Sequence, residues 1–274
     1  MHSLVVAAVT AYDPPVQLRD RHVVVTGAAG GIGSALARRF HADGARLVLT
    51  DIRGADEVSN QLPGSLSVAA DQSDEASINA MIDAAEAEFG PIDLYFANAG
   101  VAVGTDPMDD EQVWELAFAV NVHAHRWAAR RLLPGWLERG EGYFCSTASA
   151  AGLLAQIGSA PYSVTKHAAV AFAEWLSITY GNRGLRVSCL CPQGVNTDMV
   201  RRAEDLGGGG HIVRAVGVIL EPEDVADVVA EAIEAERFFV LPHPEVAGYL
   251  AMKGTEHDRW MAGMRKLQQR VVGY

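Results

Sequence analysis

Cysteine is scarce in this chain of 274 residues, in which only Cys145, Cys189 and Cys191 are present. All three lie in apolar runs that predict strands, and this placement favours buried thiols over a disulfide framework. Cys189 and Cys191 share one face of a strand, but no cluster of histidines or cysteines completes a metal site. We therefore expect no metal centre and a reducing compartment, the cytoplasm.

Basic residues are also few relative to acidic ones. Lys and Arg number 22 against 34 Asp and Glu, which gives a formal net charge of -12. Because there is no basic excess to neutralise phosphates, nucleic acid and anionic membrane surfaces are not expected as partners. The apolar run at residues 4–9 is too short to span a membrane, and no basic stretch precedes it. We expect residues 1–20 to form an N-terminal arm.

Apolar residues, in contrast, make up 49% of the chain and recur in a regular pattern. Short β-branched runs alternate with longer segments of helical spacing, such as residues 32–40, 78–89, 113–137 and 160–180. Strands that are apolar on both faces are typical of a parallel sheet covered on both sides. The pattern predicts an α/β fold in one domain, residues 1–274: a doubly wound, Rossmann-like parallel sheet of about seven strands with helices on both faces. The expected strands are residues 22–26, 46–50, 66–69, 92–96, 142–146, 185–190 and 238–241.

Two segments near the C-terminus depart from this alternation. Four consecutive glycines at 207–210 lie within residues 198–218, and their backbone freedom suits either a flexible surface loop or a mobile lid over a substrate pocket. Residues 242–274 are expected to form a helical extension with an apolar stripe. We interpret the stripe as packing or a subunit interface rather than a substrate site; it consists of Trp260, Met261, Met264, Leu267 and Val271.

A glycine-rich turn follows the first expected strand and opens the first helix. Glycines let the backbone approach a pyrophosphate, and the helix N-terminus offers unpaired N–H groups and a partial positive charge. Asp51 closes the second strand, where a carboxylate binds the adenosine ribose and repels a 2′-phosphate, so NAD is favoured over NADP. Arg53 is the nearby residue that could instead hold a phosphate. The turn predicts dinucleotide binding by Gly27, Gly30, Gly31, Ile32 and Gly33.

Three side chains downstream have complementary acid–base chemistry. Tyr162 and Lys166 are four residues apart on an expected helix and therefore share one face. An unperturbed tyrosine has a pKa near ~10, and a neighbouring ammonium would lower that pKa by stabilising the phenolate. Ser149 follows a strand, at the edge of a parallel sheet where ligands bind. This set suits a general acid/base with a hydroxyl that holds the substrate oxygen.

These motifs occur in the order found in the short-chain dehydrogenase/reductase family. The resemblance covers roughly residues 20–241 and rests on the turn at 26–33, Ala97-Asn98-Ala99-Gly100, Asn121, Ser149 and Tyr162-Ser163-Val164-Thr165-Lys166. It implies an NAD(H)-dependent oxidoreductase that interconverts a secondary alcohol and a ketone, with Tyr162 as general acid/base. It also implies that Lys166 binds the nicotinamide ribose and that Asn121 positions Lys166 through a water molecule.

Further positions resemble the family's cofactor-binding pattern. Asp71 matches the aspartate that bonds the adenine amino group, and Asn98 matches the asparagine that braces the sheet beside the cofactor. Val195 and Thr197 lie in the segment that matches the one holding the nicotinamide carboxamide. Gln193 stands where the family has a glycine, so the backbone path in that segment stays open. The resemblance thus adds to the cofactor site Asp71 with Gln72, Asn98 with Ala99 and Gly100, and Val195 with Thr197.

By analogy with the family, a mostly apolar set of residues lines the substrate pocket, with no Arg or Lys placed to hold a carboxylate or phosphate. We therefore expect an uncharged secondary alcohol or ketone as substrate. As in many family members, we expect a homotetramer joined along the helices that carry Asn121 and Tyr162. Two other functions stay open: a non-catalytic NAD-binding regulatory protein, and a related epimerase, dehydratase or enoyl reductase. The expected lining consists of the loop that contains the four glycines, together with Val101, Ala151, Leu153, Gln156, Gln193 and Met199.

Overall fold

The computed structural model of the chain describes residues 16–205 and 217–273. Its centre is a seven-stranded sheet in the order β3-β2-β1-β4-β5-β6-β7, in which every neighbouring pair is parallel. This is the doubly wound sheet that the alternating pattern predicts. The strands are β1 (His22–Thr26), β2 (Arg46–Asp51), β3 (Leu66–Ala69), β4 (Leu94–Ala97), β5 (Gly142–Thr147), β6 (Leu185–Leu190) and β7 (Phe239–Val240).

Both faces of the sheet are buried, which explains the unbroken apolar runs. Successive side chains of a strand point to opposite faces. In β1, Val23 and Val25 pack in the cluster on one face and Val24 in the cluster on the other, and all three are fully buried. Each such valine contributes roughly 1.5–3 kcal/mol to folding. An alternating apolar–polar strand would place polar side chains in one of these two cores.

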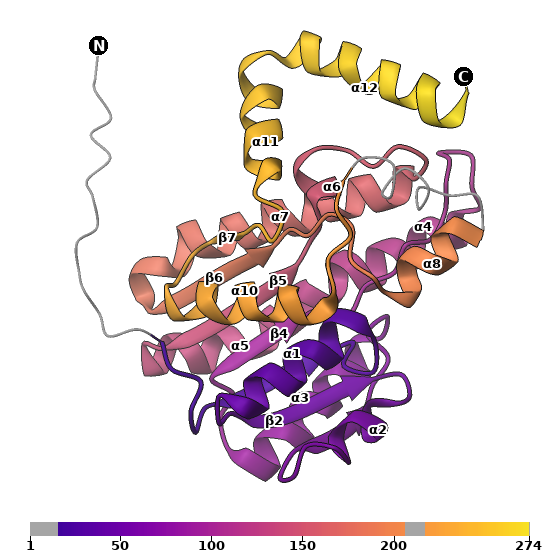
Figure 1. Ribbon diagram of the computed structural model, residues 1–274. Helices are drawn as coiled ribbons and strands as arrows, with labels where there is room; N and C mark the ends of the chain where they lie inside the picture. The colour runs from indigo at the N-terminus through magenta and orange to yellow at the C-terminus, as the bar shows by residue number, and fades with distance from the viewer. Residues whose placement is uncertain (1–15, 206–216, 274) are drawn as a thin grey trace, which may run out of the picture.

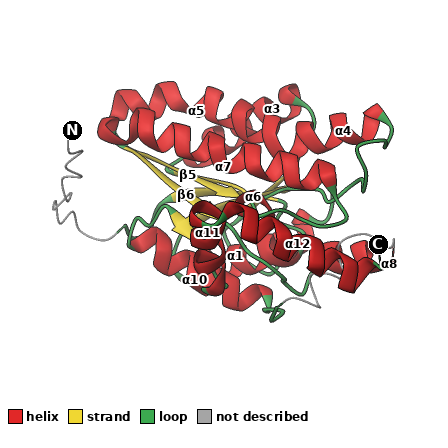
Figure 2. Cartoon of the chain, turned by 90° about the horizontal axis from the view of Figure 1, so that it is seen from above, coloured by secondary structure: helices red, strands yellow, loops and turns green. Residues whose placement is uncertain are grey.

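Helices cover the sheet in two layers, which Figure 2 shows on either side of the strands. The helices on one side are α1 (Gly31–Ala42) and α10 (Pro222–Glu234), and those on the other are α3 (Glu75–Phe89), α5 (Ala124–Arg139) and α7 (Ala160–Tyr180). Shorter elements are α2 (Ala55–Ser59), α6 (Ala150–Leu153), the 3-10 helix η2 (Gly181–Arg183) and α8 (Asp198–Asp205).

The long helix that the sequence predicts over residues 113–137 is interrupted. α4 (Glu111–Phe118) leads into a five-residue π-helix, Ala119–His123, before α5 continues. A π-helix inserts one extra residue into the turn and is frequent at functional sites. It contains Asn121, whose side chain is fully buried.

Two helices form the end of the described chain, as the helical spacing predicts. α11 (Glu245–Thr255) leads to α12 (His257–Val272), which runs across the top of the molecule in Figure 1. Lys253 on α11 ties this extension to α6, because its Nζ donates to the carbonyl oxygens of Leu153 (2.7 Å) and Leu154 (2.9 Å). The same Nζ lies 5.3 Å from the centroid of the Trp260 ring, at the start of α12. These contacts hold α12 over the region of α6.

Parts of the expected arm and lid lie outside the described residues: 1–15 of the arm and 206–216 of the lid, with its four glycines. The described part of the arm packs beside α10, since Val16 N–H donates to Glu234 O (3.2 Å) and Leu18 is buried. Within residues 16–205 and 217–273, no helix is long and apolar enough to cross a membrane.

Candidate active site

The turn between β1 and α1 has the shape of a phosphate cradle. Gly27 has a φ of +65°, and a Cβ there would lie 2.9 Å from Ala99 Cα. A Cβ on Gly33 would overlap the carbonyl group of Gly27, so the turn closes only with glycine at both positions. At Gly30 a Cβ would meet open space, and no side chain caps the N-terminus of α1. The uncapped N–H groups and the open space fit a dinucleotide pyrophosphate.

Asp51 lies beside this turn at the end of β2. Its Oδ2 accepts a hydrogen bond from the Ala29 N–H (3.2 Å), and its Oδ1 accepts one from the Ile52 N–H (2.8 Å). Two backbone donors therefore fix the carboxylate next to the glycine turn. This is the position that the ribose of an adenosine would occupy in a dinucleotide whose pyrophosphate lies at α1.

The segment predicted to contact adenine forms the turn before α3. Asp71 is exposed, and its Oδ1 accepts hydrogen bonds from the Ser73 N–H (2.8 Å) and hydroxyl (2.7 Å). Gln72 is buried, and its Nε2 has no hydrogen-bond partner among the described residues. A buried donor without a partner is costly, so a bound acceptor at this point would be stabilising.

Asn98 joins the ends of three strands. Its Nδ2 donates to Thr26 O in β1 (3.0 Å), and its Oδ1 accepts from Thr147 Oγ1 in β5 (3.0 Å). Thr26 Oγ1 in turn accepts the backbone N–H groups of Asn98 and Ala99, both at 2.9 Å. The predicted bracing role of Asn98 agrees with this geometry. Sequence reasoning placed Thr26 in the turn at 26–33 but assigned it no role, and it missed Thr147, because a threonine at a strand end carries no signal of its own.

Ser149, Tyr162 and Lys166 come together at the ends of β5 and α7. Ser149 caps α6, since its Oγ accepts the Ala151 N–H (3.1 Å); the same Oγ donates to Pro192 O (3.4 Å), and Ser149 lies close enough to the Tyr162 hydroxyl to lower the pKa of the tyrosine. Lys166 is 2% exposed; its Nζ lies 5.6 Å from the centroid of the Tyr162 ring and donates to Thr147 O (2.9 Å). The helical spacing therefore places both side chains as predicted, with the ammonium beside the ring rather than at the hydroxyl.

Burial shifts the pKa values of these groups. Desolvation raises the pKa of Tyr162, and the hydrogen bond from Ser149 only partly offsets that rise. The sequence-based expectation of a lowered pKa is therefore wrong for this state of the protein, because desolvation of the phenolate dominates. Desolvation also lowers the pKa of Lys166 to about 8. Burial, with the charge of Lys166, lowers the pKa of neighbouring His125 to about 3, so this histidine stays neutral beside the lysine.

Asn121 connects the π-helix to the rest of the site. Its Oδ1 accepts the Val101 N–H (2.9 Å), and its Nδ2 donates to Val101 O (2.9 Å) and Thr165 Oγ1 (3.1 Å). A Cβ on Gly100 would lie 3.2 Å from both Asn121 Oδ1 and Lys166 Nζ. Asn121 therefore fixes the loop after β4 and the residue that precedes Lys166 on α7.

The segment that contains Gln193 keeps its turn despite the departure from the family pattern. Leu220 N–H donates to Gly194 O (3.0 Å), and Val195 forms an isolated β-bridge with Leu220. The methyl group of Thr197 packs against Gly31, where a Cβ would overlap it. The segment predicted to hold the nicotinamide carboxamide thus lies directly against the glycine turn.

His243 supports this segment, and sequence reasoning missed it because a lone histidine in a loop carries no motif. The Gln193 N–H donates to His243 Nδ1 (3.2 Å), and His243 Nε2 lies 3.1 Å from Val218 O. An N–H can only donate and a carbonyl can only accept, so both bonds require the neutral Nε2–H tautomer. His243 is buried and ties the Gln193 turn to residue 218.

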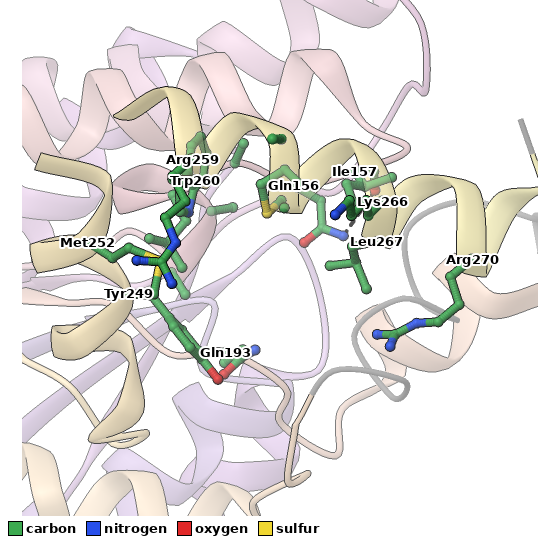
Figure 3. A pocket seen from close by; sticks show the side chains of 17 residues that line it. Gln156, Ile157, Gln193, Tyr249, Met252, Arg259, Trp260, Lys266, Leu267 and Arg270 are labelled. Carbon is green, nitrogen blue, oxygen red and sulfur yellow. Dashed lines mark hydrogen bonds between the residues drawn. The ribbon is translucent and has the colours of Figure 1, made fainter. Parts of the chain in front are cut away.

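A cavity of about 670 Å³ opens beside Ser149. Figure 3 shows its lining, which comes from α6 with the loop after it, from Gln193, and from α11 and α12. The lining residues are Ala150, Ala151, Leu154, Ala155, Gln156, Ile157, Gln193, Tyr249, Met252, Arg259, Trp260, Ala262, Gly263, Met264, Lys266, Leu267 and Arg270.

Three residues of the apolar stripe, Trp260, Met264 and Leu267, line this cavity, and α12 also contributes three basic residues to it. Of the residues expected to line the substrate pocket, Ala151, Gln156 and Gln193 line this cavity, whereas Val101, Leu153 and Met199 do not. The described residues contain no cluster of three or more His, Cys, Asp or Glu that could hold a metal ion.

Comparison with known proteins agrees with this arrangement. The short chain dehydrogenase family model matches residues 21–206. The 1-deoxy-11-beta-hydroxypentalenate dehydrogenase of Streptomyces exfoliatus is 35% identical over 245 residues, which cover 84% of this chain and 86% of that protein. The cis-4-hydroxycyclohexanecarboxylate dehydrogenase of Sinomonas cyclohexanicum is 32% identical over 219 residues, which cover 77% of this chain and 88% of that protein.

Solved structures give the same result. A short chain dehydrogenase/reductase from Burkholderia phymatum, in complex with NAD, matches with a TM-score of 0.79 and 30% identity; the match covers 89% of this chain and 96% of that chain. The present chain belongs to the short-chain dehydrogenase/reductase family. It is an oxidoreductase of that family.

Proposed function

We propose that this protein is an NAD(H)-dependent oxidoreductase that interconverts a secondary alcohol and a ketone, with Tyr162 as the general acid/base. The observation that carries the proposal is the grouping of three side chains beside a cavity: Ser149 interacts with Tyr162 and lowers its pKa, and Lys166 is buried next to the tyrosine ring. The names of the two bacterial relatives support this class, because both denote dehydrogenases of a hydroxylated acid.

The side chains divide the work of proton transfer. Ser149 and Tyr162 hold the substrate oxygen with their hydroxyls, and Ser149 is near enough to the tyrosine hydroxyl to lower its pKa. Tyr162 takes the hydroxyl proton in oxidation and returns it in reduction. Because its pKa is raised, Tyr162 rests as the phenol, the form that reduction requires. The Lys166 ammonium, 5.6 Å from the ring centroid, supplies the positive charge that favours the phenolate in oxidation.

The cofactor site fits NAD. Bound NAD supplies the hydride acceptor for oxidation, and NADH the hydride donor for reduction. Gly27, Gly30 and Gly33 shape the space for the pyrophosphate, and the fixed carboxylate of Asp51 accepts the ribose hydroxyls while repelling a 2′-phosphate. Gln72 offers its unpartnered Nε2 near the adenine end.

The decisive experiment compares Tyr162→Phe with the wild type. Oxidation of cis-4-hydroxycyclohexanecarboxylate and other secondary alcohols is followed by the absorbance of NADH. We expect the variant to lose about 10²- to 10⁴-fold in kcat, the usual contribution of a general acid/base, while NADH binding persists. Tyr180→Phe, at the far end of the same helix, is the matched control. Retention of activity by Tyr162→Phe would refute the proposed role, and a wild type that binds NADH but oxidises nothing would favour a non-catalytic regulatory protein.

We also propose that the protein forms a homotetramer along α4 and α7. Large apolar side chains are exposed there: Leu116 on α4, and Val164, Trp175 and Ile178 on α7. Ile178 (84% exposed) and Trp175 (52% exposed) are three residues apart on α7 and therefore neighbours, and adjoining exposed apolar side chains are typical of an interface. Sedimentation of the purified protein measures the state directly.

A further inference from the structure

The cavity beside Ser149 has an asymmetric charge. Its described lining contains three basic residues, Arg259, Lys266 and Arg270, and no acidic residue. In the whole chain, however, acidic residues outnumber basic ones by 34 to 22. All three basic residues come from α12, which runs across the top of the molecule in Figure 1.

The three basic residues differ in their partners. Arg259 already forms an ion pair with Glu256, with its Nη1 2.7 Å from Glu256 Oε2. Lys266 and Arg270 form no ion pair with any other described residue. They are four residues apart, so they lie on the same face of α12. Two exposed cations without an ion pair among the described residues therefore border the cavity side by side.

Apolar residues make up much of the rest of the cavity lining. Trp260, Met264 and Leu267 line the cavity from α12, and Ala151 and Leu154 line it from α6 and the residue after it. Ala151 donates its N–H to Ser149 Oγ, so the part of the cavity that Ala151 lines adjoins the candidate reaction site. Figure 3 shows Lys266, Leu267 and Arg270 toward one end of the cavity and Gln193 toward the other.

We infer that the substrate is an alicyclic or similarly compact secondary alcohol that carries a carboxylate, and that Lys266 and Arg270 bind this carboxylate. The hydroxyl lies at Ser149 and Tyr162, the carbon skeleton contacts the apolar wall, and the carboxylate reaches the two cations. The guanidinium of Arg270 is suited to a planar carboxylate because it offers two parallel N–H donors. This inference rests on the proposed function, whose substrate class it narrows; it replaces the uncharged alcohol expected from sequence.

The test measures binding separately from turnover. Cyclohexanecarboxylate and its uncharged counterpart cyclohexanecarboxamide are titrated into the protein loaded with NAD⁺, by calorimetry. We expect the carboxylate to bind about tenfold more tightly than the carboxamide, since each partly exposed charge contributes a factor of up to about five. The double variant Lys266→Gln/Arg270→Gln should lose this discrimination. Arg265→Gln, on the same helix but not in the lining, should keep it.

The outcomes separate the inference from the proposed function. Equal binding of the two probes by the wild type, unmeasurable binding of the carboxylate, or unchanged discrimination in the double variant would each overturn the carboxylate site. Titration with NADH, in which the double variant should match the wild type, shows that the cations do not serve the cofactor; a weakened affinity for NADH would assign them to the dinucleotide instead. If the probes behave as expected but Tyr162→Phe still oxidises alcohols, the proposed mechanism fails and the carboxylate site stands.

Discussion

The buried ammonium of Lys166 makes the stability of this protein depend on pH in a predictable direction. Burial lowers the pKa of Lys166 from 10.5 to about 8. Since one pKa unit corresponds to about 1.4 kcal/mol, the charged lysine destabilises the folded state by about 3 kcal/mol at neutral pH. The folded state binds fewer protons than the unfolded chain between these two pKa values, so stability rises with pH through this window. The cost is fully present below about pH 8 and disappears above pH 10.5.

Lys166→Met removes the titrating group and reveals this dependence. The variant also leaves Thr147 O without the hydrogen bond from Nζ, which costs about 1–3 kcal/mol, but that loss is the same at every pH. We therefore base the prediction on the change with pH and not on either value alone. The free energy of unfolding of the variant minus that of the wild type should fall by about 2 kcal/mol from about pH 7 to about pH 9.5.

Urea unfolding followed by tryptophan fluorescence measures both free energies. Protein concentration is held constant, because assembly of subunits adds to apparent stability. Other ionisable groups titrate equally in both proteins and cancel in the difference. Lys166→Gln, which also lacks a titrating group, should show the same change with pH in the difference between the two free energies of unfolding. This variant replaces Lys166→Met if the methionine variant folds poorly. A difference that stays constant between the two pH values would show that Lys166 is not held at a lowered pKa, and the reasoning would be wrong.

Three further perturbations test other parts of the molecule. Asp51→Ala should strengthen NADPH binding relative to NADH by about tenfold or more, because the carboxylate no longer repels the 2′-phosphate; an unchanged ratio of dissociation constants would contradict this role. Gly33→Ala should abolish the rise in melting temperature on addition of NADH, because the added Cβ would overlap the carbonyl group of Gly27. A normal rise would contradict the proposal that this glycine turn binds the pyrophosphate of the cofactor. Trp175→Glu, at an exposed apolar position on α7, should reduce the sedimentation coefficient to that of smaller species, and a sedimentation profile equal to that of the wild type would exclude this surface as the interface.

The parts of the site that local rules determine could be predicted from the sequence. A spacing of four residues on a helix places Tyr162 and Lys166 on one face whatever the surroundings. A strand followed by a glycine turn and a helix leaves the N–H groups of α1 uncapped, and the end of the next strand brings Asp51 beside that turn. Continuous apolar runs likewise predicted a sheet covered on both faces. In β1, adjacent valines pack in two separate hydrophobic clusters, one on each face of the sheet.

Contacts between distant segments could not be predicted in this way. The π-helix around Asn121 leaves the apolar pattern of residues 113–137 almost unchanged, because it inserts a single residue within one turn. His243 receives its role from two loops that meet only in the folded chain. The sign of the pKa shift of Tyr162 depends on how completely the hydroxyl is desolvated, and four-residue spacing contains no information about burial.

The role of the apolar stripe on α12 could not be assigned from the sequence for a more general reason. An apolar stripe on a helix shows that one face is covered, but the stripe does not show whether protein or ligand covers it. In this protein part of the stripe lines a cavity, and the same cavity is bordered by two exposed cations, Lys266 and Arg270, which have no ion pair among the described residues. The net charge of -12 strengthens the argument: an overall negative field repels anions, so the two cations are effective only within about 8–10 Å, the range over which a charge acts at physiological salt. Recognition of a carboxylate by this chain would therefore have to arise inside the cavity, at the residues that border it.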